Sequence, residues 1–200
     1  MEEEKQLSVS ELFYSIQGEG ANTGIPAFFI RLTGCNVRCP WCDSPETWSG
    51  RKGELMGSAR ISEMVAESGA VNVVITGGEP LLHDLSELTG ELRRIGINIL
   101  LETSGTVPFS GVFDWVCVSP KKAMPPLDEN YGLADELKVI ISDESDFIWA
   151  EECSAKVKED CKLFLQPEWN SMAVPLVVEY IKRHSEWRLS LQTHKFINVR

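Results

Sequence analysis

The stretch PAFFIRLTGCNVRCPWCD, residues 26–43, decides the fold of this chain. Its first seven residues form an apolar run interrupted only by Arg31, which is typical of a buried strand. Cys35, Cys39 and Cys42 follow at once in the spacing CxxxCxxC. Three thiols on one loop leave a metal corner without a protein ligand, because structural zinc sites and electron-transfer cubanes take four. The loop therefore predicts a site that does chemistry at an open metal corner.

Short apolar runs recur after this strand. They predict strands over residues 71–75, 97–101, 113–118, 137–141 and 163–165, with a last strand at 189–191. Helical periodicity lies between them, at 61–65, 81–95 and 174–181, and the segments 49–60 and 121–134 resemble loops. A full eight-stranded barrel takes roughly 250 residues. A chain of 200 residues with about six parallel strands therefore predicts an α/β fold, a partial TIM-like barrel open on one side. We expect one domain over residues 1–200.

Nearly every predicted strand ends in a small polar cluster. The clusters are TGGEP at 76–80, ETSG at 102–105, SPK at 119–121 and QP at 166–167. In parallel α/β sheets and barrels, ligands bind at the carboxyl ends of the strands. The cysteine loop and these clusters are therefore expected to face one mouth.

Composition excludes some functions and partners. The formal net charge of −11 opposes binding to nucleic acid phosphates. The acidic start MEEEK predicts no signal peptide, and no apolar stretch approaches the roughly 20 residues of a membrane span. We therefore expect a cytoplasmic protein, in a compartment where disulfides are rare. Cys117, Cys153 and Cys161 show no ligand spacing, and Cys117 is expected to be a buried small hydrophobe.

The cysteine loop alone leaves alternatives open. A zinc site could be completed by a distant His or Cys, and a conventional iron–sulfur cluster would need a fourth thiol, for which Cys117 is the obvious candidate. Either would make the chain a non-enzymatic zinc or iron–sulfur interaction module. Metal analysis separates these, since about four iron and four sulfide per chain indicate the cubane.

Two motifs together resemble the radical S-adenosylmethionine (SAM) enzymes: CxxxCxxC after the first strand and GGEP at 77–80 after the second. The resemblance implies that Cys35, Cys39 and Cys42 bind a [4Fe–4S] cluster, whose fourth iron is chelated by the methionine moiety of SAM. It also implies a set of SAM contacts: Trp41, Cys42, Asp43, Gly78, Glu79, Thr103, Ser119, Pro120, Lys121, Gln166, Pro167, Glu168 and Trp169. Glycines let the backbone approach the cofactor closely.

Further motifs extend the resemblance over nearly the whole chain. FYSIQGEG at 13–20, GIPAFFIRLTGCN at 24–36, CDS, ETSG, SPK, LQP and LQTHK together resemble the 7-carboxy-7-deazaguanine synthases. The resemblance implies a radical ring contraction of 6-carboxy-5,6,7,8-tetrahydropterin to 7-carboxy-7-deazaguanine with loss of ammonia, assisted by Mg²⁺. This reaction belongs to the biosynthesis of the deazapurine nucleosides queuosine and archaeosine. The cofactor would supply the radical and the protein the orientation.

Substrate contacts follow from the same matching positions: Ile16, Gln17, Gly18, Glu19, Arg31, Thr76, His194 and Arg200. The Arg31 guanidinium suits the substrate carboxylate. The terminal carboxylate of Arg200 is expected to accept the paired N–H edge of the pterin, with Glu19 as the competing carboxylate. Ser44 would ligate Mg²⁺, where the family more often has Thr.

The resemblance also implies partners. These are a one-electron donor such as a flavodoxin or ferredoxin and a second copy of the chain in a homodimer. The main alternative is a radical enzyme that activates a glycyl-radical partner protein. Mg²⁺ dependence and turnover of a free small molecule would separate the two.

Overall fold

The computed structural model describes residues 5–50 and 53–200, so most of the acidic start and part of the 49–60 loop lie outside the described residues. Within these ranges, nine strands form one sheet in the order β3-β1-β2-β4-β5-β6-β7-β8-β9. The strands are β1 (Gln6–Ile16), β2 (Pro26–Leu32), β3 (Glu54–Gly57), β4 (Asn72–Gly77), β5 (Asn98–Thr103), β6 (Trp115–Val118), β7 (Glu136–Ile141), β8 (Lys162–Pro167) and β9 (Trp187–Leu189). From β2 to β9 every neighbouring pair is parallel, whereas β1 and β3 pair antiparallel.

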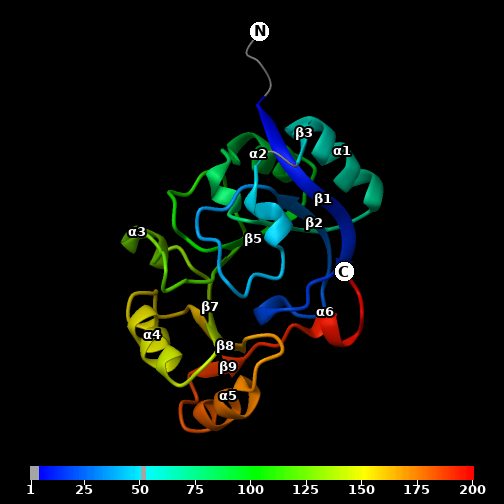
Figure 1. Ribbon diagram of the computed structural model, residues 1–200. Coiled ribbons are helices and arrows are strands. Elements are labelled where there is room, and N and C mark those ends of the chain that lie inside the picture. Colours follow the sequence, from blue (N-terminus) through cyan, green and yellow to red (C-terminus); the bar gives the residue numbers. More distant parts are fainter. Residues whose placement is uncertain (1–4, 51–52) are drawn as a thin grey trace.

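Helices cover the outer face of the sheet. The α-helices are α1 (Ser58–Ser68), α2 (Ser86–Arg94), α3 (Asp128–Tyr131), α4 (Ser145–Ser154), α5 (Ala173–Ile181) and α6 (Thr193–Phe196), and short 3-10 turns are η1 (Gly20–Asn22), η2 (Pro45–Trp48) and η3 (Pro80–Leu82). In Figure 1, α1 and α2 lie near one end of the sheet and α4 and α5 near the other. The main core fills the space between sheet and helices, with Ile30, Ile75 and Leu101 fully buried. None of the described helices is long and apolar enough to cross a membrane.

The inner face of the sheet carries polar side chains near the carboxyl ends of its strands. Side chains alternate along a strand, so Phe29 and Arg31 share the face opposite to Ile30. A small inner cluster of Ala27, Phe29, Val74 and Leu100 is buried. The next residues on that face toward the carboxyl ends are Arg31, Thr76 and Glu102. The strand pattern thus places charged and polar groups directly above an apolar floor.

The predicted partial barrel is confirmed, with differences at its edges. The last strand lies at 187–189 rather than 189–191, and the predicted helix over 81–95 divides into η3 and α2. The expected loops contain β3, the start of α1 and α3. The strand β1 was not predicted, because QLSVSELFYSI mixes polar and apolar residues and only its first half is buried. One domain over residues 1–200 stays a prediction.

The end of β1 and the turn that follows it meet the C-terminal segment where the sheet stays open. The Thr193 N–H donates to the Gly18 carbonyl at 2.9 Å, and the Gly20 N–H donates to Ser190 Oγ at 2.9 Å. Ser15 Oγ donates to the Arg200 main-chain oxygen at 2.5 Å. Figure 1 shows α6 and the C-terminus beside β1 and β2. Residues before β2 and after β9 therefore close one side of the mouth together.

Candidate active site

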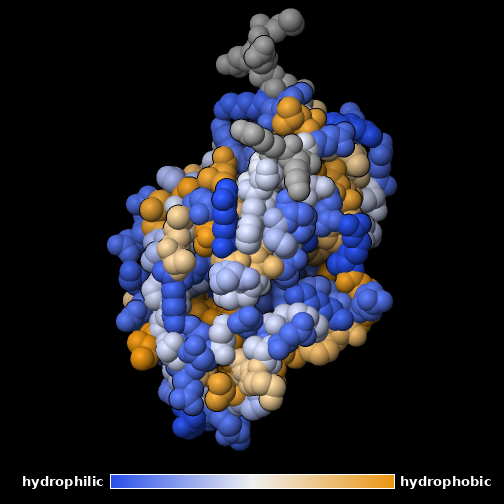
Figure 2. Space-filling model, viewed as in Figure 1, coloured by the Kyte–Doolittle hydropathy of each residue, from blue (hydrophilic) through white to orange (hydrophobic). Residues whose placement is uncertain are grey.

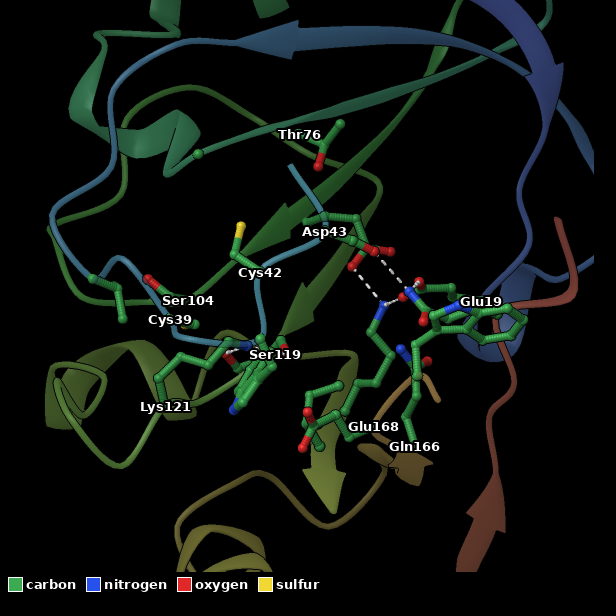
Figure 3. Close-up of a pocket in the computed structure, with 18 of the residues that line it drawn as sticks. Glu19, Cys39, Cys42, Asp43, Thr76, Ser104, Ser119, Lys121, Gln166 and Glu168 are labelled. Atoms are coloured by element: carbon green, nitrogen blue, oxygen red, sulfur yellow. Dashed lines mark hydrogen bonds and ion pairs between the residues drawn. The ribbon is translucent and has the colours of Figure 1, made fainter. Parts of the chain in front are cut away.

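Two adjoining cavities lie at the carboxyl edge of the parallel strands. The first is lined by the cysteine loop and by residues that follow β4, β5, β6 and β8. The second is lined by β1, the QGEG turn, β2 and α6. They share Glu19, Cys42, Asp43, Thr76, Gly77, Glu102 and Lys195. Figure 2 shows a mainly hydrophilic face in this orientation, and Figure 3 shows side chains from several strand ends converging on the first cavity.

The cysteine loop is held by the glycine-rich loop after β4. The Gly34 N–H donates to the Thr47 carbonyl at 2.6 Å, which folds η2 back on the loop, and the Glu79 N–H donates to the Gly34 carbonyl at 2.8 Å. A Cβ placed on Gly78 would lie 2.3 Å from that carbonyl oxygen. Only glycine allows so close an approach, so the GGEP motif needs Gly78 in order to pack against the cysteine loop.

All three predicted ligand cysteines line the first cavity. Burial and the neighbouring Cys42 and Cys35 thiols raise the pKa of Cys39, against the opposing effect of Lys121. Across residues 5–50 and 53–200, no three His, Cys, Asp or Glu side chains already form a metal-holding group. Cys117 is buried on β6, 3.6 Å from Glu136, as expected of a small buried residue. It lines neither cavity.

Most predicted SAM contacts gather in the first cavity. They are Trp41, Cys42, Asp43, Gly78, Thr103, Ser119, Lys121, Gln166, Pro167, Glu168 and Trp169. Glu79 and Pro120 do not line it. Glu79 is completely buried, and its carboxylate accepts from Thr103 Oγ1 at 2.6 Å and from the Ser104 N–H at 2.8 Å. Its side chain therefore braces the ETSG segment rather than facing the cavity.

Lys121 holds the SPK turn against the cysteine loop. Its Nζ donates to the Ser119 carbonyl at 2.6 Å and lies 5.4 Å from the centre of the Trp41 ring. Burial lowers the pKa of Lys121, with Cys39 opposing the effect. In Figure 3 the Lys121 side chain extends beside Ser119 at the edge of the cavity.

All predicted substrate contacts line the second cavity. Arg31 Nε donates to Glu11 Oε1 at 2.7 Å, and the Arg200 guanidinium pairs with the other oxygen of Glu11. Both guanidinium groups lie over the Phe13 ring, at 5.8 and 5.1 Å. The two arginines form a cationic corner around one carboxylate.

The QGEG turn and α6 form the opposite wall. A Cβ on Gly18 would lie 2.3 Å from His194 Nδ1, so glycine is required for the histidine to approach the turn. Burial lowers the pKa of His194, although Glu19 pulls it upward. Ser44 lines the same cavity, next to Asp43 and Glu46. Its N–H donates to Cys42 Sγ at 3.4 Å, which ties the predicted magnesium position to the cluster loop.

Sequence reasoning missed several residues that complete this site. Lys138 is 3% exposed and its Nζ lies 2.7 Å from Glu19 Oε2 and 2.9 Å from Glu102 Oε2. Gln192 Nε2 donates to Glu19 at 2.9 Å and to Asp43 at 2.8 Å. A usable signal existed for Lys138, because a lysine inside the apolar run LKVII is as unusual as Arg31 inside PAFFIRL.

This arrangement of a three-cysteine loop, a glycine loop and a parallel sheet defines a radical SAM fold, and a family model described as "Radical SAM superfamily" matches residues 29–116. A 7-carboxy-7-deazaguanine synthase of Synechocystis sp. is 48% identical over 193 residues, covering 96% of this chain and 93% of the relative. That of Flavobacterium psychrophilum is 43% identical over 204 residues, covering 100% and 95%. The crystal structure of QueE from Escherichia coli matches with a TM-score of 0.86 at 35% identity, covering 94% of this chain and 95% of that one.

The chain belongs to the 7-carboxy-7-deazaguanine synthase family. The resemblance drawn from the motifs is thereby confirmed, together with the fold and the enzyme class. Membership decides against a glycyl-radical activase and against a zinc interaction module.

Proposed function

We propose that this chain converts 6-carboxy-5,6,7,8-tetrahydropterin into 7-carboxy-7-deazaguanine and ammonia, as a radical SAM enzyme of deazapurine biosynthesis. One observation carries the proposal beyond family membership. The cavity lined by the three cysteines adjoins a second cavity with a cationic corner, and both share Glu19, Thr76 and Glu102. A radical source and an anionic substrate can therefore sit side by side, which is what positioning for hydrogen transfer requires.

The residues of the first cavity fit an iron–sulfur cluster with SAM. Three thiols on one loop are the donor set of a cubane with an open corner. The buried indole N–H of Trp48, in the wall of the same cavity, has no hydrogen-bond partner within the described residues, and cluster sulfur is a suitable acceptor. When bound, the cluster and SAM supply the 5′-deoxyadenosyl radical. Trp41, Asp43, Thr103, Ser119, Lys121, Gln166, Pro167, Glu168 and Trp169 would hold SAM, with the Gly78 backbone beside it.

The second cavity would hold the pterin by its two ends. Arg31 binds the substrate carboxylate in place of Glu11, since a guanidinium pairs with carboxylates in bidentate fashion. Thr76 would lie between the two cavities, against both SAM and substrate. Ile16, Gln17 and Gly18, with Glu19, His194 and Arg200, would hold the ring system. Its N–H groups need acceptors such as carboxylate oxygens.

Magnesium binding by Ser44 belongs to this proposal. A serine hydroxyl is a hard oxygen ligand, and Mg²⁺ accepts one or two protein ligands together with substrate oxygens and water. The Ser44 position lines the substrate cavity beside two carboxylates, those of Asp43 and Glu46. Ser44 would then hold the ion next to the cluster loop, in the cavity proposed for the substrate.

The partners of the enzyme belong to the same proposal. The chemistry needs a one-electron donor, such as a flavodoxin or ferredoxin, because the cluster must be reduced before each cleavage of SAM. The negative net charge argues against a nucleic acid partner. We propose a homodimer, which the family resemblance implies, and a cytoplasmic location, which the sequence predicts.

The test is anaerobic. The protein is reconstituted with iron and sulfide and given the carboxytetrahydropterin, SAM, Mg²⁺ and a reductant. We expect a product lighter than the substrate by one ammonia, and no product from a Cys39→Ala variant prepared in the same way. Cleavage of SAM without that product would overturn the proposal.

A further inference from the structure

The wall between the two cavities contains a buried lysine held between two carboxylates. Only 4% of the Lys138 side chain is exposed, and its Nζ contacts Glu19 at 2.7 Å and Glu102 at 2.9 Å. The three residues come from different elements: Glu19 precedes η1, Glu102 lies on β5 and Lys138 on β7. A buried charge without partners is strongly unfavourable, so burial of Lys138 depends on its two carboxylate partners.

The trio has an orientation. Glu19 and Glu102 line both cavities, whereas Lys138 lines only the cavity of the cysteines. Seen from the substrate cavity, the lysine therefore lies behind the carboxylates. A second donor fixes each carboxylate, because Gln192 donates to Glu19 at 2.9 Å and Gln17 donates to Glu102 at 3.0 Å. Both carboxylates are thus fixed in the wall that the two cavities share before substrate binds.

We propose that Lys138 is a positioning residue for the pterin, which keeps Glu19 and Glu102 ionised side by side as hydrogen-bond acceptors for the N–H groups of the substrate. The inference rests on the proposed function, since it assigns the pterin to the second cavity. Lys138 acts through the two carboxylates and does not itself contact the ring.

The physical reason is the repulsion between two neighbouring buried carboxylates. Without a cation, one of them takes up a proton, because two like charges in one site raise one pKa strongly. A protonated carboxyl group turns from acceptor to donor at one oxygen and then opposes a pterin N–H. Burial opposes ionisation of Glu19, but Lys138, Gln192 and His194 outweigh it and lower its pKa to about 2. Burial lowers the pKa of Lys138, but Glu102, Glu19 and the other acidic groups around it outweigh burial and raise the pKa.

Other titratable groups face the trio and must be considered. They are Glu136 and Cys117 below it, Asp43 and Lys121 on the cysteine side, and His194 and Lys195 on α6. Burial raises the pKa of Glu136 and of Cys117. His194 titrates in wild-type and variant alike. The effect of Lys138 is therefore the difference between the pH profiles of pterin affinity in wild-type and in Lys138→Gln.

The experiment measures pterin binding by the reconstituted enzyme with SAM and without reductant. The probe is 6-carboxypterin, followed by its fluorescence between about pH 6 and about pH 9, a range that lies above the ordinary carboxyl pKa. The variants are Lys138→Gln and Lys138→Arg. Lys158→Gln serves as the matched control, because Lys158 pairs with Asp135 at 2.6 Å and lines neither cavity.

We expect Lys138→Gln to bind the probe about tenfold more weakly than wild-type at the acidic end, and to recover toward wild-type at the alkaline end, as its raised carboxyl pKa is passed. Lys138→Arg keeps the charge and should keep the wild-type pH profile. Lys158→Gln should match wild-type throughout. A uniform loss of affinity at every pH in Lys138→Gln would show a merely structural lysine and overturn the inference.

A second measurement needs no variant. If both carboxylates are already ionised, calorimetry of wild-type in buffers of different ionisation enthalpy will find no proton released when the probe binds at neutral pH. Release of about one proton would contradict the inference. Wild-type that neither binds the probe nor turns over the tetrahydropterin would instead count against the proposed function.

Discussion

The two cavities of this protein are built in opposite ways. The cysteine cavity takes its three thiols from a single loop. The wall between the two cavities is assembled from three separate elements, with each carboxylate paired to Lys138 and held by one amide. One region therefore depends on the spacing of residues within one loop, and the other depends on contacts between residues far apart in the chain.

The difference follows from what each region must bind. A cubane brings its own rigid geometry, so the protein needs to supply only thiolates on a loop that can adjust. A pterin supplies N–H groups and a carboxylate, whose partners must point correctly in advance if binding is to orient the ring. Variants in the first region should therefore affect cofactor content, and variants in the second should affect substrate affinity.

The largest expected effect is in the cysteine cavity. Cys39→Ala should abolish activity and lower bound iron to background, because two thiolates no longer hold a cubane. The circular dichroism spectrum should stay near that of wild-type, since Cys39 belongs to no core cluster of the described residues. Cys161→Ala, at a buried position away from both cavities, is the control and should keep its iron. Loss of fold in Cys39→Ala would mean that the loop is structural after all.

A smaller effect is expected at the cationic corner of the substrate cavity. Arg31→Gln should weaken binding of the carboxylated pterin about 100-fold, because losing one partner of a desolvated charge pair typically costs about 2–5 kcal/mol. SAM binding and iron content should not change. Arg93→Gln removes an exposed arginine that pairs with Asp114 at 2.9 Å, and should leave pterin affinity unaltered. Equal losses for both ligands would contradict the division between the cavities.

Arg200 should matter less than Arg31. Its side chain is 71% exposed although it shares Glu11 with Arg31. Exposed ion pairs contribute about 0–1 kcal/mol, so Arg200→Ala should weaken pterin binding only about fivefold. Binding titrations of the two variants side by side test this ranking. A loss as large as that of Arg31→Gln would show that both guanidinium groups hold the substrate carboxylate.

The smallest expected effect lies at Ser44. Threonine is stiffer at χ1 than serine, so Ser44→Thr should present its hydroxyl to Mg²⁺ with less rotational freedom. We expect the Mg²⁺ concentration for half-maximal activity to fall about threefold. Ser44→Ala, which keeps the size but removes the hydroxyl, should raise it. Identical Mg²⁺ dependence in all three proteins would remove Ser44 from the proposed magnesium site.

The same contrast decides what the sequence could reveal. The cysteine loop and GGEP are contiguous motifs, and each chemical requirement is met within a few neighbouring residues, so spacing alone predicted them. Lys138 gains its meaning from Glu19 and Glu102, which lie 119 and 36 positions away in the chain. No local sequence pattern predicts contacts between residues so far apart. A lysine in a buried strand nevertheless indicates that it has charged partners.

The sequence also predicted the strands of the fold only in part. The parallel strands were predicted because both faces are buried and their sequences are nearly uniformly apolar. β1 was missed because it is an antiparallel strand whose second half lines a cavity and alternates only weakly. Glu79 was expected at the cofactor, since its motif suggested a cavity-facing carboxylate. Its burial against Thr103 and Ser104 depends on how two strand ends pack, which the motif does not contain.

The contacts of residues 15–20 with the C-terminal segment have a consequence for folding. The contacts that close the substrate side join residues 170 to 185 positions apart, as in Gly20 with Ser190, Glu19 with Gln192 and Ser15 with Arg200. Contacts of such long sequence separation form late, because the loop entropy is lost before they are gained. The main-chain contact between the cysteine loop and the loop after β4 joins Glu79 to Gly34, only 45 positions apart. We therefore expect the cysteine loop and the loop after β4 to become ordered before the wall of the substrate cavity, an order that pulsed hydrogen exchange during refolding would test.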